Sequence, residues 1–432
     1  MTSSAAAGPR SSASGWRRAL SPRSAGVVYA LAALVTFLTF ASSAQGRQNY
    51  LSIINITNVL DQSSLIGILA IFMTVVLISG NFDLSVASTA ALAGTLALKL
   101  LDHHGPAIAI AAALLSGAAV GLVNAVLVQK VGVNAFIVTL GTLTAVRGVV
   151  QVMLNGQSIT ATNTTFLTFE TARWTLPQSV AVGAGAVILV VVAVRAVRSG
   201  DRLRALGGAT PVLAVGVALL AVGALLPGLL TETTPVWLML VLTALTSAVL
   251  RYTVIGRNIY AVGGNAEAAR LSGINVDRYK MGAFVLNGTA AGVVGILYAG
   301  KFNSVDPTVL TGGELTVIAA AILGGTSLFG GSGYVAKSVI GTLVLFTLSN
   351  GFNVLNIGSN YQNLVQGGVL IAAASLYTAS TARGRNFFGS RAGLLRRNHA
   401  TARQGAPQAG GGTASAVESG QHETIIPTPL AE

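Results

Sequence analysis

The sequence predicts an all-α polytopic membrane protein with about twelve transmembrane helices and an inverted-topology internal repeat. Of the 432 residues, 52% are hydrophobic and only 9% are charged, whereas about a quarter of a soluble domain is charged. Apolar runs of the length that crosses a hydrocarbon core of about 30 Å recur along the chain. The 51 glycines suit close helix packing in lipid, and the lack of cysteine excludes disulfides and thiolate metal sites.

The apolar runs place the expected spans in order along the membrane domain, residues 26–380. They are 26–45, 62–80, 84–101, 106–129, 134–154, 176–196, 211–230, 235–251, 279–300, 314–330, 335–352 and 361–380. Residues 1–25 and 381–432 are rich in Ala, Ser, Gly and Arg without apolar periodicity, and we expect disordered tails there.

The basic residues predict the orientation of the chain in a plasma (cell) membrane. Twenty-one of the 26 Lys and Arg residues lie in the tails and in alternate connecting segments, and only four lie in the other segments. The positive-inside rule therefore predicts that both termini are cytoplasmic. The net charge of +13 thus indicates topology, and no nucleic-acid partner is expected.

Two parts of the chain, about 62–154 and 279–380, resemble each other. Residues 83–86, 92, 94 and 95 match 314–317, 323, 325 and 326 at an offset of 231, and three further matches follow at an offset of 226. An odd number of spans separates the two matching starts, so the halves should face opposite ways, as in many transporters. Composition alone also makes apolar, glycine-rich helices look alike.

Three ionisable residues lie near membrane depth, where charge is costly and is often functional: Asp83, Arg147 and Glu314. The two acids stand at expected helix starts, so each either caps a helix or lines a pathway. Arg147 either lines the pathway or reaches the outer interface with its long side chain.

Uncharged polar residues suit a solute with many hydroxyl groups, although they also serve as hydrogen bonds between transmembrane helices. With the ionisable residues they form a candidate translocation pathway: Asn81, Asp83, Asn134, Phe136, Thr139, Arg147, Asn287 and Glu314. The GxxxG pairs Gly117/Gly121 and Gly288/Gly292 predict close helix packing inside the bundle.

The connecting segment 252–278 predicts a short surface helix on the cytoplasmic face. Asn265 suits an N-cap, Ala and Leu favour helix, and Gly273 suits a C-terminal stop. The residues of interest there are Gly263, Gly264, Asn265, Glu267, Arg270, Ser272 and Gly273. Capping alone is equally consistent with a connector that has no partner.

Residues that would carry catalysis are missing from the sequence. Residues 331–338 approach a P-loop, but Ala336 replaces the glycine before the lysine and no strand precedes them, so the chain is not expected to bind ATP. His103 and His104 beside Asp102 indicate a surface turn rather than a metal site. No enzyme activity, cofactor or metal is expected.

The motifs resemble the ribose/xylose/galactose-type permease family of ABC importers over most of 50–380. They are Gly80–Val86, Gly121–Asn124, Val133–Leu143, Arg147–Gly148, Tyr260–Asn265, Arg270–Ile274, Gly313–Leu315, Ile318–Ala320 and Leu323–Gly331. The family motif Gly-Ile-Asp-Leu-Ser is changed here, because Phe82 stands at its second place.

This resemblance implies a permease dimer on two ATP-binding subunits, which receives a monosaccharide from an extracytoplasmic binding protein. It also implies that residues 258–274 form the coupling segment that docks the ATPase. An apolar hairpin at about 176–230 resembles the xylose-type branch, so a pentose such as xylose or ribose is expected. The alternatives are an ion-coupled secondary transporter of a small polar solute, whose ion site would need Asp83 or Glu314, and a passive channel.

Overall fold

The computed structural model describes residues 22–47, 49–198, 210–357 and five single positions between 361 and 371, within one compact unit. The longer helices are α2 (Pro22–Ala44), α3 (Ile53–Ile78), α4 (Val86–Val126), α5 (Ala135–Leu154), α7 (Gln178–Arg198), α9 (Thr210–Leu225), α10 (Thr234–Tyr252), α13 (Val276–Phe302) and α15 (Val335–Leu355). The shorter ones are η2 (Leu127–Val131), α6 (Thr165–Thr171), η3 (Pro227–Leu230), α11 (Val254–Gly264), α12 (Ala266–Leu271) and α14 (Gly313–Leu323).

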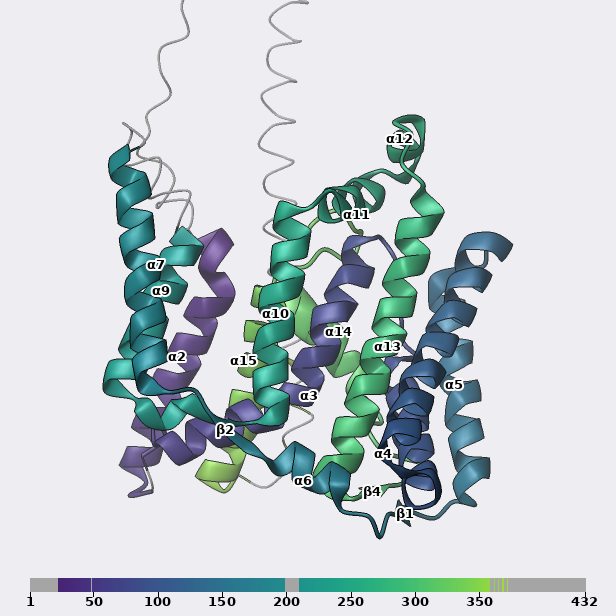
Figure 1. The fold of residues 1–432 in the computed structure, drawn as a ribbon, viewed down its shortest axis with the longest axis horizontal. Coiled ribbons are helices and arrows are strands. Elements are labelled where there is room, and N and C mark those ends of the chain that lie inside the picture. The colour runs from purple at the N-terminus through teal and green to yellow at the C-terminus, as the bar shows by residue number, and fades with distance from the viewer. Residues whose placement is uncertain are drawn as a thin grey trace, which may run out of the picture. The chain divides into compact units, whose positions relative to one another are not determined.

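Two pairs of short antiparallel strands join distant connecting segments. β1 (Ile159–Thr160) pairs with β4 (Ser304–Val305), and β2 (Arg173–Thr175) pairs with β3 (Thr231–Thr233). In Figure 1 these strands and α6 lie at one end of the helices, while α11 and α12 lie at the other. We call these the strand end and the α12 end.

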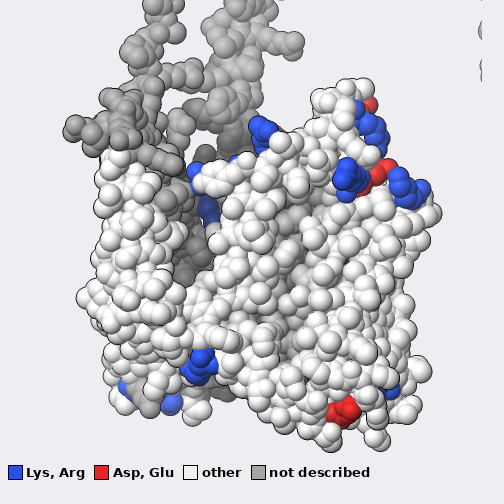
Figure 2. All heavy atoms as spheres, viewed as in Figure 1, with Lys and Arg blue, Asp and Glu red and all other residues white. Residues whose placement is uncertain are grey.

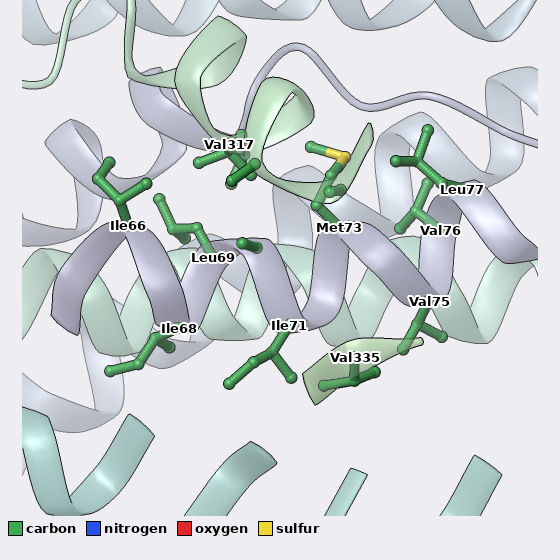
Figure 3. Packing of buried hydrophobic residues seen from close by; sticks show 14 of the residues in the cluster. Ile66, Ile68, Leu69, Ile71, Met73, Val75, Val76, Leu77, Val317 and Val335 are labelled. Carbon is green, nitrogen blue, oxygen red and sulfur yellow. The ribbon is translucent and has the colours of Figure 1, made fainter. Parts of the chain in front are cut away.

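Helix α3 forms the centre of the packed helices. It contacts α10, α13, α14 and α15, and Ile68, Leu69 and Ile71 are fully buried. Figure 3 shows its side chains meeting Val317 of α14 and Val335 of α15. Residues 65–78 of α3 are almost all apolar, and a helical stretch that is apolar on every side is stable in a position enclosed by other helices.

Helix α4 is two helices joined by a sharp turn, as the two expected spans at 84–101 and 106–129 require. Gly105 has a left-handed φ of 76°, and Pro106 begins the second part. That second part packs on α13 with so little space that a Cβ atom on Gly117 would overlap the carbonyl oxygen of Gly288. The GxxxG glycines therefore lie at a helix–helix contact inside the bundle, as predicted.

Seven of the described helices are long and apolar enough to cross a membrane, and three shorter apolar helices accompany them. In Figure 2, charged side chains gather toward the two ends of the face shown, and the surface between them is largely uncharged. These features are those of a polytopic membrane protein. Most of the expected span 361–380, most of the first tail and all of the second lie outside the described residues.

The expected span 314–330 is not one continuous helix. Helix α14 has 11 residues and ends at Leu323, because Gly324 and Gly325 follow and Gly325 adopts a φ of +85°. At about 1.5 Å per residue the helix covers roughly half of the hydrocarbon core. Residues 324–334 continue without regular secondary structure to the start of α15. Such backbone is tolerated at membrane depth only where protein encloses it, and α14 does lie between α3 and α15.

Candidate translocation site and docking segment

A buried polar network surrounds Asp83 in the break between α3 and α4. Its side chain is 1% exposed, and Oδ1 accepts hydrogen bonds from the backbone N–H of Ser85 (3.0 Å) and from its hydroxyl (2.6 Å). Oδ2 accepts a hydrogen bond from the Nδ2 of Asn287 on α13 at 2.9 Å. Asp83 thus holds the turn that starts α4 and ties it to α13.

The network extends to α5 through Asn124, which the sequence indicated as a repeat match and as part of a family motif but not as a pathway residue. Asn124 of α4 donates to the hydroxyl of Ser85 (2.9 Å), and its Oδ1 accepts from Thr142 of α5 (2.7 Å). Within the described part of the chain, the Nδ2 of Asn81 and the Oδ1 of Asn287 are buried without a hydrogen-bond partner. Buried polar atoms normally find partners, so these two atoms remain open to another ligand or to water.

Arg147 and Glu314 form a second group, nearer the strand end. The guanidinium of Arg147 donates from Nη1 to the carbonyl oxygens of Pro307 (2.9 Å) and Val309 (2.7 Å), in the loop before α14. The carboxylates of Glu314 and Asp306 lie within electrostatic range of it. Arg147 therefore holds this loop, and the structure does not bring Glu314 and Asp83 into one cluster.

The other candidate residues on α5 have different surroundings. Asn134 is exposed and caps the helix by accepting from the backbone N–H of Phe136 (2.9 Å), whose ring is 53% exposed. Thr139 is buried, and its hydroxyl donates to the carbonyl of Ala135 in its own helix (2.8 Å). Asn134 and Phe136 thus lie at the exposed start of α5, whereas Thr139 faces its helix neighbours.

A polar pocket lies at the strand end, beside the loop that Arg147 holds. It has a volume of about 630 Å³ and is lined by Gln151, Gly156, Gln157, Ser158, Asp306, Pro307 and Thr308. Pro307 accepts a hydrogen bond from Arg147, so pocket and arginine share one loop. Amide, hydroxyl and carboxylate groups of this kind can pair with a polyhydroxylated solute.

The short helix predicted in the connecting segment 252–278 is present as α12, with the predicted caps. We call residues 258–274 the docking segment, after the role that the family resemblance implies. Asn265 accepts from the backbone N–H of Ala268 (2.9 Å), and the hydroxyl of Ser272 donates to the carbonyl of Ala268 (2.9 Å). Gly273 adopts a φ of +80° directly after the helix, which glycine allows without strain.

Helix α12 is anchored on one face and free on the other. A small apolar cluster of Val262, Ala269 and Val276 holds it on α11 and α13. Arg270 lies 3.6 Å from Asp277, which also pairs with Lys130 of η2 at 2.9 Å. Glu267 is exposed, and Leu271 is 85% exposed. Glu267 and Leu271 therefore lie on the exposed face of α12.

Sequence reasoning missed an acidic group at the strand end. Asp61 of α3 forms an ion pair with Lys301 of α13 and accepts from the hydroxyl of Thr233 (2.7 Å). Glu170 of α6 and Glu232 of β3 are each 2% exposed and lie near this pair. These residues are far apart in the sequence, and no local pattern joins them.

Apolar helices with buried polar groups at the breaks between them define a multi-pass membrane protein. The chain belongs to the family described as the branched-chain amino acid transport system permease component, whose sequence profile matches residues 55–374.

Its curated relatives include import permeases for sugars. Ribose import permease protein RbsC of Escherichia coli K12 is 37% identical over 317 residues, 73% of this chain and 83% of the relative. The L-arabinose ABC transporter permease protein AraH of Azospirillum brasilense is 33% identical over 72% of this chain and 76% of its own length. The xylose transport system permease protein XylH of E. coli K12 is 34% identical over 75% and 84%. No solved structure matches the chain significantly.

Proposed function

We propose that this chain is the permease subunit of an ATP-binding-cassette importer for a monosaccharide, with a pentose such as ribose or xylose as the preferred class. The observation that carries the proposal is the similarity, over 72 to 75% of the chain, to permeases named for ribose, L-arabinose and xylose. The amide groups of Asn81 and Asn287 beside Asp83 agree with a neutral, hydroxyl-rich cargo.

The pathway in this proposal runs between the two polar groups. Asn81, Asp83 and Asn287 lie at the break between α3 and α4, and Arg147 and Glu314 lie at the loop before α14 and the start of that helix. The buried atoms of Asn81 and Asn287 that lack partners among the described residues support a pathway there. The polar pocket beside Asp306 forms the entry at the strand end.

The orientation places the α12 end and both termini in the cytoplasm. The basic residues support it, and so do the strand pairs, which join connecting segments assigned to the same outer side. About twelve crossings result in this scheme. The two parts of α4 count as two crossings, α14 with residues 324–334 counts as one, and the expected span 361–380 is included. In the same scheme Asp83 and Glu314 begin corresponding segments of two inverted halves, 62–154 and 279–380.

Two ATP-binding subunits, a second copy of this chain and an extracytoplasmic sugar-binding protein complete the importer. The exposed face of α12, with Glu267 and Leu271, supports docking of an ATPase at the cytoplasmic end. ATP hydrolysis then takes place on that separate subunit, since the glycine-rich stretch near Lys337 departs from a P-loop. An ion-coupled mechanism needs no docking helix.

Reconstitution in liposomes tests the proposal. The chain is combined with its ATP-binding subunit and with an extracytoplasmic sugar-binding protein, and uptake of labelled ribose, xylose and arabinose is measured. Uptake should require all three proteins and ATP on the α12 side. Uptake by the chain alone, driven by an ion gradient, would contradict an ATP-driven importer.

A further inference from the structure

The segment α11–α12 touches the bundle backbone to backbone at Gly263. A Cβ atom on Gly263 would overlap the carbonyl oxygen of Ile78, the last residue of α3, and would lie 2.9 Å from the backbone nitrogen of Gly331. At the neighbouring Gly264 the nearest atom, the Cα of Gly331, would be 3.9 Å away, which is an ordinary contact. Of these two glycines on α11, only Gly263 therefore lies in a contact that a side chain would disrupt.

The irregular segment 324–334 closes the same junction from the other side. The backbone N–H of Gly331 donates to the carbonyl of Ile78 at 2.9 Å and so satisfies an acceptor that the end of α3 leaves open. A Cβ on Gly330 would lie 2.6 Å from the carbonyl oxygen of Gly263 and 2.9 Å from the Cα of Gly80. Gly80 and Gly330 both adopt a φ of +83°, which favours glycine for a second reason.

A side-chain hydrogen bond adds to these backbone contacts. The hydroxyl of Tyr260 on α11 donates to the carbonyl of Gly333 at 2.8 Å. Segment 324–334 is fixed in turn to α3 and α15, because Ser338 accepts from Thr74 at 2.7 Å and lies 3.3 Å from the hydroxyl of Thr326. The α11 segment thus cannot shift without moving either Ile78 or residues 330–333.

Both contacts lead to the polar groups of the proposed pathway. Ile78 precedes Asp83 by five residues, and the intervening chain has no helical structure beyond the turn at Gly80. Segment 324–334 follows directly from α14, which begins beside Glu314. Among the described glycines, those of α11 are the ones that bring another helix into close backbone contact with both the end of α3 and segment 324–334.

We propose that Gly263 is a positioning residue that couples the docking segment to both helix breaks at once. Movement of α12 by its partner is passed through the Gly263–Ile78–Gly331 junction to the Asp83 break and to segment 324–334 together. This inference rests on the proposed importer function, and it adds the point at which force from the ATPase enters the pathway.

The test is Gly263→Ala in the complete reconstituted importer, with Gly282→Ala as the matched control. Gly282 lies on α13, and a Cβ there would meet nothing within 4 Å. The Gly263 variant should still co-purify with the ATPase and hydrolyse ATP, but sugar uptake per ATP and stimulation of the ATPase by the loaded binding protein should be lost. Unchanged uptake per ATP would overturn the proposal.

Tyr260→Phe keeps the question decidable if Gly263→Ala does not fold. This variant removes the hydrogen bond from Tyr260 to Gly333 and adds no volume. It should lower sugar uptake per ATP and leave the melting temperature unchanged. Normal uptake per ATP would overturn the coupling role. If the wild-type complex shows no ATP-dependent uptake, the proposed function fails. If wild type and Gly282→Ala transport and Gly263→Ala equals them, only the junction fails.

Discussion

The carboxylate of Asp83 has more partners than a simple helix cap. It accepts from Ser85 next to it in the chain and from Asn287, which lies 204 residues away. In an enclosed site of low polarity such bonds are strong, and a donor that loses its acceptor is costly. Asp83 therefore stabilises the break as well as facing the proposed pathway, and the two roles are separable by substitution.

Asp83→Leu should destabilise the protein far more than Asp83→Asn. Leucine strands the donors of Ser85 and Asn287, at a cost of about 1–3 kcal/mol for each buried group, whereas asparagine keeps one acceptor oxygen. Thermal unfolding of the purified protein in detergent measures this difference. Glu267→Gln, on the exposed face of α12, should leave the melting temperature unchanged. Equal losses of melting temperature in the Leu and Asn variants would show that the acceptor oxygen at position 83 contributes no stability.

At the scale of elements, the contact between α4 and α13 depends on three glycines on each helix, which are Gly94, Gly117 and Gly121 on α4 and Gly288, Gly292 and Gly295 on α13. A Cβ on Gly288 would overlap the carbonyl oxygen of Gly117, and one on Gly292 would lie 2.8 Å from the carbonyl oxygen of Ala113. Without a hydrophobic driving force between helices in lipid, such close packing supplies much of their attraction.

Gly288→Ala should therefore lower the melting temperature in detergent, by several degrees or more, because one of the two helices must move away. Gly282→Ala on the same helix meets open space and should leave it unchanged. If both alanine variants melted alike, the close contact between the helices would not be a source of stability.

The acidic group at the strand end should make stability depend on pH. The pKa values of Glu170 and Glu232 are raised from the ordinary 4.5 to about 7, mainly by burial. Lys301 opposes the shift at Glu170 and Arg173 opposes it at Glu232, while the nearby Asp61 adds to both shifts. The folded protein thus binds protons more tightly than the unfolded chain. Stability should fall as pH rises from about 4.5 to about 7 and then level off.

The double variant Glu170→Gln/Glu232→Gln removes both titrating groups and should flatten this dependence. Its melting temperature should exceed that of the wild type at about pH 8, where the wild-type carboxylates are charged and buried. Glu267→Gln, an exposed acid at the other end, should retain the wild-type profile. A double variant with the wild-type slope between about pH 5 and pH 7 would exclude these two residues as its source.

At the scale of the whole molecule, the elements were largely predictable, because apolar length and capping act locally. The helix after Asn265 and the close packing at Gly117 and Gly288 followed from such patterns. The end of α14 at Leu323 did not, since hydropathy does not reveal where backbone leaves the helix at Gly325. At the candidate site, Asp83 and Arg147 stood out as ionisable residues at membrane depth.

Their partners could not be predicted from local patterns. Asn287 was a candidate only by residue type, and 204 residues separate it from Asp83. The carbonyl acceptors of Arg147 carry no sequence signal at all. The same holds for Gly263, whose importance depends on the position of Ile78 in space rather than on its neighbours in sequence.

The orientation of the two halves yields the last prediction, which uses single cysteines because the native chain has none. Leu271 and Phe329, 85% and 91% exposed, lie on α12 and in segment 324–334, which meets α11. Ser158 and Thr311 are exposed near β1 and before α14. A membrane-impermeant maleimide should label positions 158 and 311 on intact cells, and positions 271 and 329 only after permeabilisation.

The pair 311 and 329 decides whether α14 and the segment after it form one crossing. Labelling of positions 311 and 329 from the same side would mean that the chain turns back between them. The inverted relation of Asp83 and Glu314 would then be lost, because it requires the chain to cross the membrane between Glu314 and α15. Labelling from opposite sides with all four positions exchanged would leave the repeat intact and overturn the orientation instead. Only the predicted pattern places Asp83 nearer the cytoplasm, beside the segment on which an ATPase would act, and Glu314 nearer the side from which the sugar arrives.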